Sequence, residues 1–220
     1  MRMGDAGTRF TTDLDVARSR TLDSYLDTLS RSLAIGWNGF TGRIATVDPP
    51  HPEGIPELYV MMPFAVKLDF LGKPWVTVPL EVGHDEIGDA RDAEYAISPD
   101  IVDFFRSLGF PEPQPVPLMP LHHQIAQKLH ALSSPKSQRA HDLIDLQLIV
   151  RNETFDKQLV KNTCVKLFKY RKAQAWPCSI EVHEGWPRLY ESQAQGLPVL
   201  ENVEDAVAWA RDFVRDINQS

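Results

Sequence analysis

Thr11-Thr12-Asp13-Leu14-Asp15, inside the segment RFTTDLDVARS at residues 9–19, decides how the first part of the chain is interpreted. Side chains two residues apart in a strand project to the same face, so Asp13 and Asp15 are expected to point together. Aspartate is a poor strand former and the two carboxylates repel each other, so the pair needs a counter-charge. Mg²⁺ would supply it, because this ion commonly joins one or two carboxylates to nucleotide phosphates. An exposed turn is the alternative for so short a motif.

Two later segments offer a third carboxylate. Asp69 lies in K-L-D-F at residues 67–70, on a strand expected to neighbour the first one, and Glu81 in V-P-L-E-V at residues 78–82 is the competing candidate. Three carboxylates from adjacent strands are the minimum for two-metal chemistry, in which one ion activates a hydroxyl and the other stabilises the leaving group. Asp69 is also typical of an ordinary strand end.

A second polar cluster falls in helical sequence. I-A-Q-K-L-H-A-L at residues 125–132 is followed by R-A-H-D-L-I-D-L at residues 139–146. On a helix Asp142 and Asp145 share one face, and a short polar loop predicts a helical hairpin that brings Lys128 near that face. The pairing is either structural, or Lys128 reaches a nucleotide phosphate while Asp145 orients the phosphate or an acceptor hydroxyl.

The pattern of apolar residues predicts an α+β fold with an N-terminal lobe at residues 1–110, a Pro-rich crossover at 111–120 and a mainly helical lobe at 121–220. Residues 181–189 fit either a strand or a loop. The expected helices are 21–33, 101–108, 118–132, 143–150 and 203–217, and the expected strands are 42–47, 57–64, 65–71 and 75–82.

The composition, with 43% hydrophobic and 24% charged residues among 220, is that of a soluble globular protein. The longest apolar runs are too short to cross a bilayer and Met1 is not followed by a basic and apolar leader, so we expect a cytoplasmic protein without a membrane partner. Cys164 and Cys178 are the only cysteines, which predicts two ordinary thiols.

The net charge of −7 disfavours indiscriminate binding to nucleic acid, but the charge is uneven. Residues 151–172 carry seven basic and two acidic side chains, a local charge of +5. The segment is either an RNA-binding face, on which Phe168, Tyr170 and Trp176 stack on bases, or a solvated helix whose aromatic residues belong to the core. The candidate RNA-binding residues are Lys161, Lys166, Lys169, Arg171 and Lys172.

Together these motifs resemble the AbiEii/AbiGii-type nucleotidyltransferase toxins of the DNA polymerase β-like superfamily, from about Arg9 to Val150. The resemblance implies a bilobed fold, Mg²⁺ dependence and nucleotide transfer from a nucleoside triphosphate. Relatives of this kind, mycobacterial ones included, act on the 3′ acceptor end of tRNA, which blocks translation, and are neutralised by a cognate antitoxin. By the same resemblance Asp13, Asp15 and Asp69 bind metal, Asp13, Asp15, Lys128 and Asp145 are catalytic, and Thr11, Thr12, Lys128, Arg139 and Asp142 bind the nucleotide.

One departure from the family pattern leaves alternatives open. Relatives carry a Gly-Gly-Ser/Thr turn before D-L-D, whose backbone amides hold phosphate, and residues 1–12 do not contain it. The true start lies upstream, the nucleotide is held differently, or the chain is a degenerate member that binds RNA or a partner protein without catalysis. A separate alternative is an HD-type phosphohydrolase, built on His141-Asp142 with His122, His123 and His130.

Overall fold

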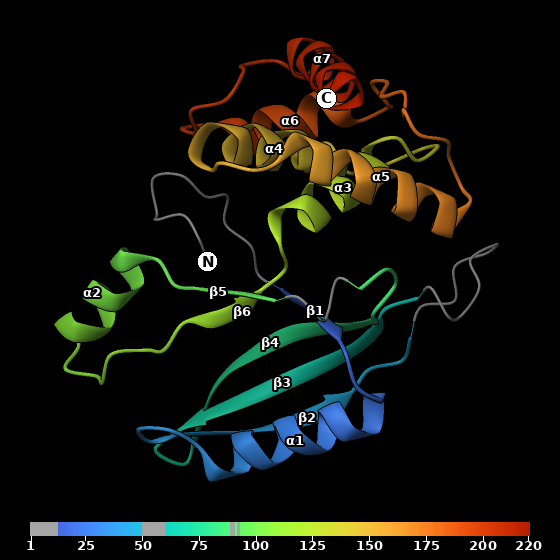
Figure 1. Ribbon diagram of the computed structural model, residues 1–220. Coiled ribbons are helices and arrows are strands. Elements are labelled where there is room, and N and C mark those ends of the chain that lie inside the picture. The colour runs from blue at the N-terminus through green and yellow to red at the C-terminus, as the bar shows by residue number, and fades with distance from the viewer. Residues whose placement is uncertain (1–12, 50–59, 89–90, 92) are drawn as a thin grey trace. The chain divides into compact units, whose positions relative to one another are not determined.

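The computed structural model describes residues 13–49, 60–88, 91 and 93–220, which form two compact units divided after Arg91. Thr11 and Thr12 lie outside the described residues. The expected crossover at 111–120 lies within the second unit, because strand β6 (Val116–Leu118) pairs with strand β5 (Glu94–Ala96). The α+β class is confirmed, with a mixed sheet in the first unit and a mainly helical second unit (Figure 1).

The first unit is a four-stranded sheet with one helix on it (Figure 1). The strands are β1 (Leu14–Arg18), β2 (Phe40–Thr46), β3 (Met62–Phe70) and β4 (Lys73–His84), in the spatial order β1-β4-β3-β2. β1 runs parallel to β4, and the other pairs are antiparallel. The break expected between residues 64 and 65 is wrong: β3 continues through it, because its alternating apolar residues keep the same face to the core.

Helix α1 (Leu22–Ile35) covers one face of this sheet. Thr21 caps its first turn, with its side-chain oxygen accepting from the Ser24 amide at 3.4 Å. The helix ends at Gly36, where φ is 73° and a Cβ would lie 2.2 Å from the Phe40 carbonyl oxygen. The apolar side chains of α1 pack on a sheet core of Phe64, Val66, Leu80 and Val82. The helix expected over 21–33 is therefore confirmed.

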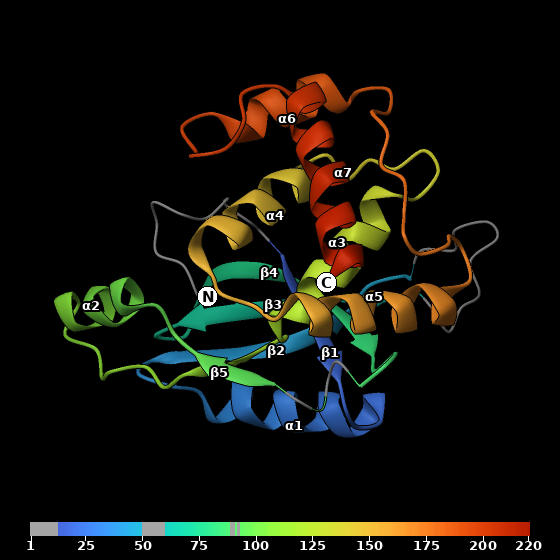
Figure 2. The same cartoon turned by 45° about the horizontal axis from the view of Figure 1, so that its top comes forward.

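In the second unit, the helices that follow residue 120 pack together around the α3–α4 hairpin. Its helices are α2 (Pro99–Ser107), α3 (Leu121–Leu132), α4 (His141–Asn152), α5 (Lys157–Arg171), α6 (Trp186–Ala194) and α7 (Val203–Gln219). α3 packs on α4 and α5, and α7 packs on α4, α5 and α6 (Figure 2). The buried stripe of α7 is the one expected from its sequence, and it includes Phe213 and Ile217.

The segment 181–189, which fitted either a strand or a loop, contains the start of a helix instead. α6 begins at Trp186, whose buried indole anchors it to the core. Cys164 and Cys178 are both free thiols, as expected. Within the described parts of the chain no helix combines the length and apolarity needed to cross a membrane.

Candidate functional site

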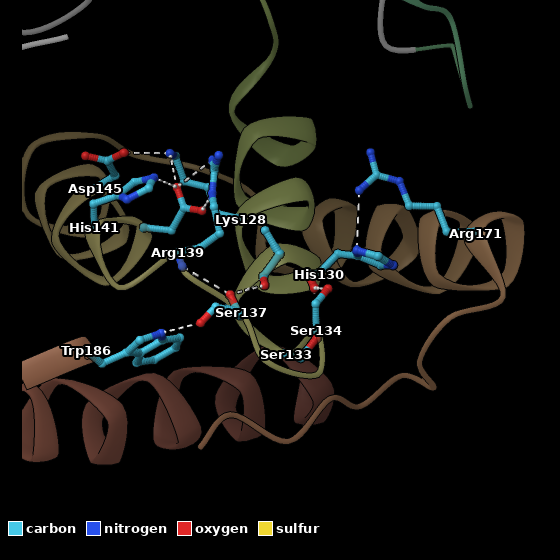
Figure 3. Close-up of polar contacts among 12 residues, drawn as sticks. Lys128, His130, Ser133, Ser134, Ser137, Arg139, His141, Asp145, Arg171 and Trp186 are labelled. Carbon is cyan, nitrogen blue, oxygen red and sulfur yellow. Dashed lines mark hydrogen bonds and ion pairs between the residues drawn. The ribbon is translucent and has the colours of Figure 1, made fainter. Parts of the chain in front are cut away.

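Lys128, Asp142 and Asp145 lie together on the α3–α4 hairpin (Figure 3). The Lys128 Nζ donates to Asp142 Oδ1 at 2.8 Å and to Asp145 Oδ2 at 2.7 Å. Asp142 is fully buried, whereas the side chains of Lys128 and Asp145 remain 20% and 19% exposed. The predicted proximity of the lysine to both aspartates is confirmed, and one side of the cluster is open to solvent.

Arg139 joins the same cluster from the loop before α4. Its Nε donates to Asp142 Oδ2 at 2.8 Å, and its Nη2 lies 3.4 Å from Asp142 Oδ1. The Arg139 side chain is 51% exposed although its partner is completely buried. One buried carboxylate thus holds two cations, each of which keeps part of its surface accessible, an arrangement suited to binding an anion such as a phosphate.

Opposing effects act on the charge of Lys128. Burial lowers its pKa, but the negative charges of Asp142 and Asp145 and their hydrogen bonds outweigh burial, so the pKa is raised above its ordinary value. Lys128 therefore stays protonated throughout the physiological range. A cation of this kind binds and orients anionic groups, but it does not act as a general base.

In the first unit, the strand register places Glu81 beside Asp15. Asp15 of β1 is paired with Glu81 of β4, so their side chains project to the same face of the sheet. Their neighbours Val16 and Val82 belong to the core that α1 covers, so the two carboxylates lie on the opposite face. Asp13 immediately precedes β1, and Asp13, Asp15 and Glu81 are all exposed.

Asp69 does not lie next to Asp15 and Glu81. The prediction that its strand neighbours the first strand is wrong, because β4 lies between β1 and β3. Asp69 is paired with Pro74 near the β3–β4 turn, six residues along β3 from Pro63, which is paired with Glu81. That separation is about 20 Å along the strand. Asp69 instead forms an ion pair with Arg43 at 3.2 Å, so Glu81 replaces it as the third carboxylate near Asp15.

The donor groups near Asp15 suit a metal ion whose remaining ligands come from a substrate. In the described ranges no three His, Cys, Asp or Glu side chains gather closely enough to hold a metal ion by themselves. Mg²⁺ in nucleotide sites is usually held by one or two carboxylates together with phosphate oxygens and water, and the exposed pair Asp13 and Asp15 fits that donor set. His122, His123, His130 and His141 of the HD-type alternative are all among the described residues and form no such group there.

Most of the basic segment lies in helix α5, with Lys172 as its C-terminal cap, and its residues divide between surface and core. Lys166, Lys169 and Lys172 are exposed, whereas Lys161 donates to the Ser220 carbonyl oxygen at 2.9 Å. Phe168 is only 2% exposed, so the expectation that it stacks on bases is wrong: its ring packs against those of His130 and Trp176. The RNA-binding role of the lysines stays a prediction.

His130 follows Lys128 by two residues on α3 and lies next to Arg171 of α5 (Figure 3). The Arg171 guanidinium lies 3.3 Å from His130 Nδ1, and His130 is 7% exposed. Burial disfavours the imidazolium, and the positive charge of Arg171 adds to that effect, so the pKa of His130 is lowered to about 4. His130 is therefore a neutral core residue at physiological pH.

Comparison with known proteins identifies the family. The family model described as "Nucleotidyl transferase AbiEii toxin, Type IV TA system", in which TA denotes toxin–antitoxin, matches residues 2–218. The chain belongs to this family of nucleotidyltransferase toxins, which implies a nucleotide substrate and a cognate antitoxin. No curated protein matches the sequence. Among solved structures the chain is similar to MenT4, nucleotidyltransferase toxin Rv2826c from Mycobacterium tuberculosis H37Rv, with 16% identity, a TM-score of 0.47, and coverage of 95% of this chain and 77% of that chain.

The buried carboxylate of Asp142 is expected to make a large contribution to stability. Asp142→Asn removes the charge that neutralises Lys128 and Arg139, which should lower the free energy of unfolding by about 3–5 kcal/mol. Asp212→Asn is the matched control, because Asp212 pairs with Arg215 at the same spacing on the surface and should cost less than about 1 kcal/mol. Urea unfolding of the three proteins measures both values. Equal losses in the two variants would contradict the anchoring role of Asp142.

The lowered pKa of His130 predicts that the protein loses stability in acid. The unfolded chain binds a proton at this residue below about pH 6.5, whereas the folded chain binds it only near pH 4, so stability falls as the pH falls through that interval. The loss due to this residue is at most about 3 kcal/mol. In urea unfolding between pH 7 and pH 4, His130→Gln should show a smaller loss than the wild type. If the free energy of unfolding fell equally with pH in both proteins, the lowered pKa of His130 would be contradicted.

Proposed function

We propose that this protein transfers nucleotides from a nucleoside triphosphate to RNA, at the 3′ acceptor end of tRNA, in a Mg²⁺-dependent reaction that blocks translation. The observation that carries the proposal is the Lys128–Asp142–Asp145 cluster, in a chain that belongs to a nucleotidyltransferase toxin family. The cluster supplies a permanent, partly exposed cation, which phosphoryl and nucleotidyl transfer require to offset developing negative charge.

Lys128 and Arg139 bind the triphosphate in this proposal. Both cations are held by the buried Asp142, and each keeps part of its side chain accessible to solvent. Asp145 is the accessible carboxylate of the cluster, and it orients Lys128 toward the phosphate or accepts a hydrogen bond from the acceptor hydroxyl. Asp142 therefore contributes to binding through Lys128 and Arg139, because its own atoms are buried.

Asp13 and Asp15 would hold Mg²⁺ together with the nucleotide, and Glu81 is the neighbouring carboxylate. When bound, the ion neutralises phosphate charge and lowers the pKa of an attacking hydroxyl. Mg²⁺ prefers hard carboxylate oxygens, and these three carboxylates are exposed on β1, β4 and the residue before β1. Their local chemistry thus supports the same reaction class as the Lys128 cluster.

Exposed lysines of the basic segment supply affinity for RNA in this proposal. Lys166, Lys169 and Lys172 lie on a segment whose local charge of +5 contrasts with a net charge of −7 for the whole chain. Contacts with phosphates depend on basic side chains and weaken as salt concentration rises. RNA binding that is insensitive to salt, or unchanged when these three lysines are replaced by glutamine, would contradict this assignment.

The decisive test is incubation of the purified protein with total tRNA, Mg²⁺ and each labelled nucleoside triphosphate in turn. The wild type should transfer label to RNA. Asp13→Ala and Lys128→Ala should lower the transfer rate by at least about 100-fold, because they remove charges that act on the reacting phosphates. Asp48→Ala is the matched control, because Asp48 is an exposed aspartate of the same unit as Asp13, and it should remain active. Folded wild-type protein that binds RNA but transfers no label would instead identify a non-catalytic member of the family.

A second experiment distinguishes the two candidates for the third carboxylate. Glu81→Gln should raise the Mg²⁺ concentration needed for half-maximal transfer, because it removes a charge beside Asp15. Asp69→Asn should leave that concentration unchanged, since Asp69 is paired with Arg43 near the far end of the sheet. Titration of the two variants with Mg²⁺ measures the difference. If Asp69→Asn raised the Mg²⁺ concentration for half-maximal transfer more than Glu81→Gln, the placement of Glu81 at the metal site would be wrong.

A further inference from the structure

Ser137, in the loop that joins α3 to α4, forms hydrogen bonds through its hydroxyl, its amide and its carbonyl oxygen. Its hydroxyl donates to the Ala131 carbonyl oxygen at 2.8 Å and accepts from the Arg139 amide at 3.2 Å. Its own amide donates to the Ser134 carbonyl oxygen at 3.1 Å. The residue is 6% exposed. One small side chain therefore ties the last turn of α3 to the backbone of Arg139.

Trp186 holds Ser137 from the opposite side (Figure 3). The indole Nε1 donates to the Ser137 carbonyl oxygen at 2.6 Å, and Trp186 is completely buried at the start of α6. The contact joins residues 49 positions apart, so it fixes the loop against a different helix. A phenylalanine would fill most of the same space but would lack the N–H donor.

These contacts lead directly to the cations of the candidate site. Arg139 follows Ser137 by two residues, and its guanidinium shares the Asp142 carboxylate with Lys128. The Asp142 amide donates to the Arg139 carbonyl oxygen at 2.8 Å, so the backbone of Arg139 also forms the first turn of α4. The direction of the Arg139 side chain thus depends on a loop whose conformation Ser137 and Trp186 determine.

We propose that Ser137 and Trp186 are positioning residues for nucleotide binding, which hold the α3–α4 loop so that Arg139 stays against Asp142 beside Lys128. The catalytic part of this inference rests on the proposed function. Neither residue touches the nucleotide: each acts through Arg139. Without the indole N–H or the Ser137 hydroxyl the loop shifts, Arg139 leaves Asp142, and the pair of phosphate-binding cations is lost.

The first test is a double-mutant cycle in the transfer assay. Ser137→Ala and Trp186→Phe should each lower kcat/KM for the nucleotide about three- to tenfold, as expected for the loss of one or two hydrogen bonds. In an Arg139→Ala background the same substitutions should change kcat/KM less than about twofold, because the residue through which they act is absent. Full, additive losses in that background would overturn the proposal, since they would reveal a general structural role.

Matched controls separate positioning from simple loss of a side chain. Ser192→Ala removes an exposed hydroxyl of α6 that donates to Leu189, and Trp209→Phe alters a tryptophan of α7 that stacks on Phe213. Both should retain wild-type kcat/KM. Ser137→Thr keeps the hydroxyl and should recover more activity than Ser137→Ala, with circular dichroism and thermal unfolding confirming that each variant is folded.

The second test does not depend on activity. Phenylglyoxal modifies accessible guanidinium groups, and peptide mass spectrometry gives the modification rate at each arginine. The rate at Arg139 should rise severalfold in Ser137→Ala and Trp186→Phe, while the rate at the exposed Arg188 stays constant. An unchanged Arg139 rate would overturn the positioning role. A wild type that transfers no nucleotide, but whose Arg139 rate rises in both variants, would refute the proposed function and leave the positioning inference standing.

Discussion

The buried carboxylate of Asp142 is the constraint on which the second unit depends. An ionised carboxylate excluded from water is costly unless opposite charges and hydrogen bonds replace its solvation. Lys128 and Arg139 provide both, the first from α3 and the second from the loop before α4. The α3–α4 hairpin must therefore keep one register, because sliding the helices by a turn would separate Asp142 from its donors. The loop contacts of Ser137 and Trp186 follow from the same requirement.

This requirement also explains why the sequence predicted the hairpin cluster well. The two aspartates are three residues apart on one helix, and Lys128 precedes them across a short polar loop, so local periodicity alone places all three on facing surfaces. The carboxylates of the sheet were different. Which strand lies next to β1 depends on pairing between distant segments, and no local pattern distinguishes β3 from β4 as that neighbour. The expected position of Asp69 next to the first strand is therefore wrong, and the register of β4 places Glu81 beside Asp15.

Similar reasoning accounts for the parts of the second unit that the sequence left open. Helix α6 is nine residues long and begins after Gly185 with Trp186-Pro187, a pair that is as typical of a loop as of a first helical turn. Its place in the fold comes from the buried indole, which is a tertiary contact. The place of Phe168 also depends on a tertiary contact, since burial against α3 assigns its ring to the core while Lys166 and Lys169 remain at the surface.

The Lys128 cluster combines two demands that usually conflict. A buried ion network favours one closed arrangement, whereas a phosphate-binding site must exchange some of its internal contacts for a ligand. Different members of the cluster meet the two demands, because their side chains differ in exposure. Asp142 has no accessible surface, while the side chains of Asp145, Lys128 and Arg139 are 19%, 20% and 51% exposed. The contacts to Asp142 involve a carboxylate without accessible surface, whereas both side chains of the Lys128–Asp145 pair are partly accessible to solvent. In the proposed reaction, a phosphate would bind Lys128 and Arg139 without exposing the buried charge that holds the hairpin together.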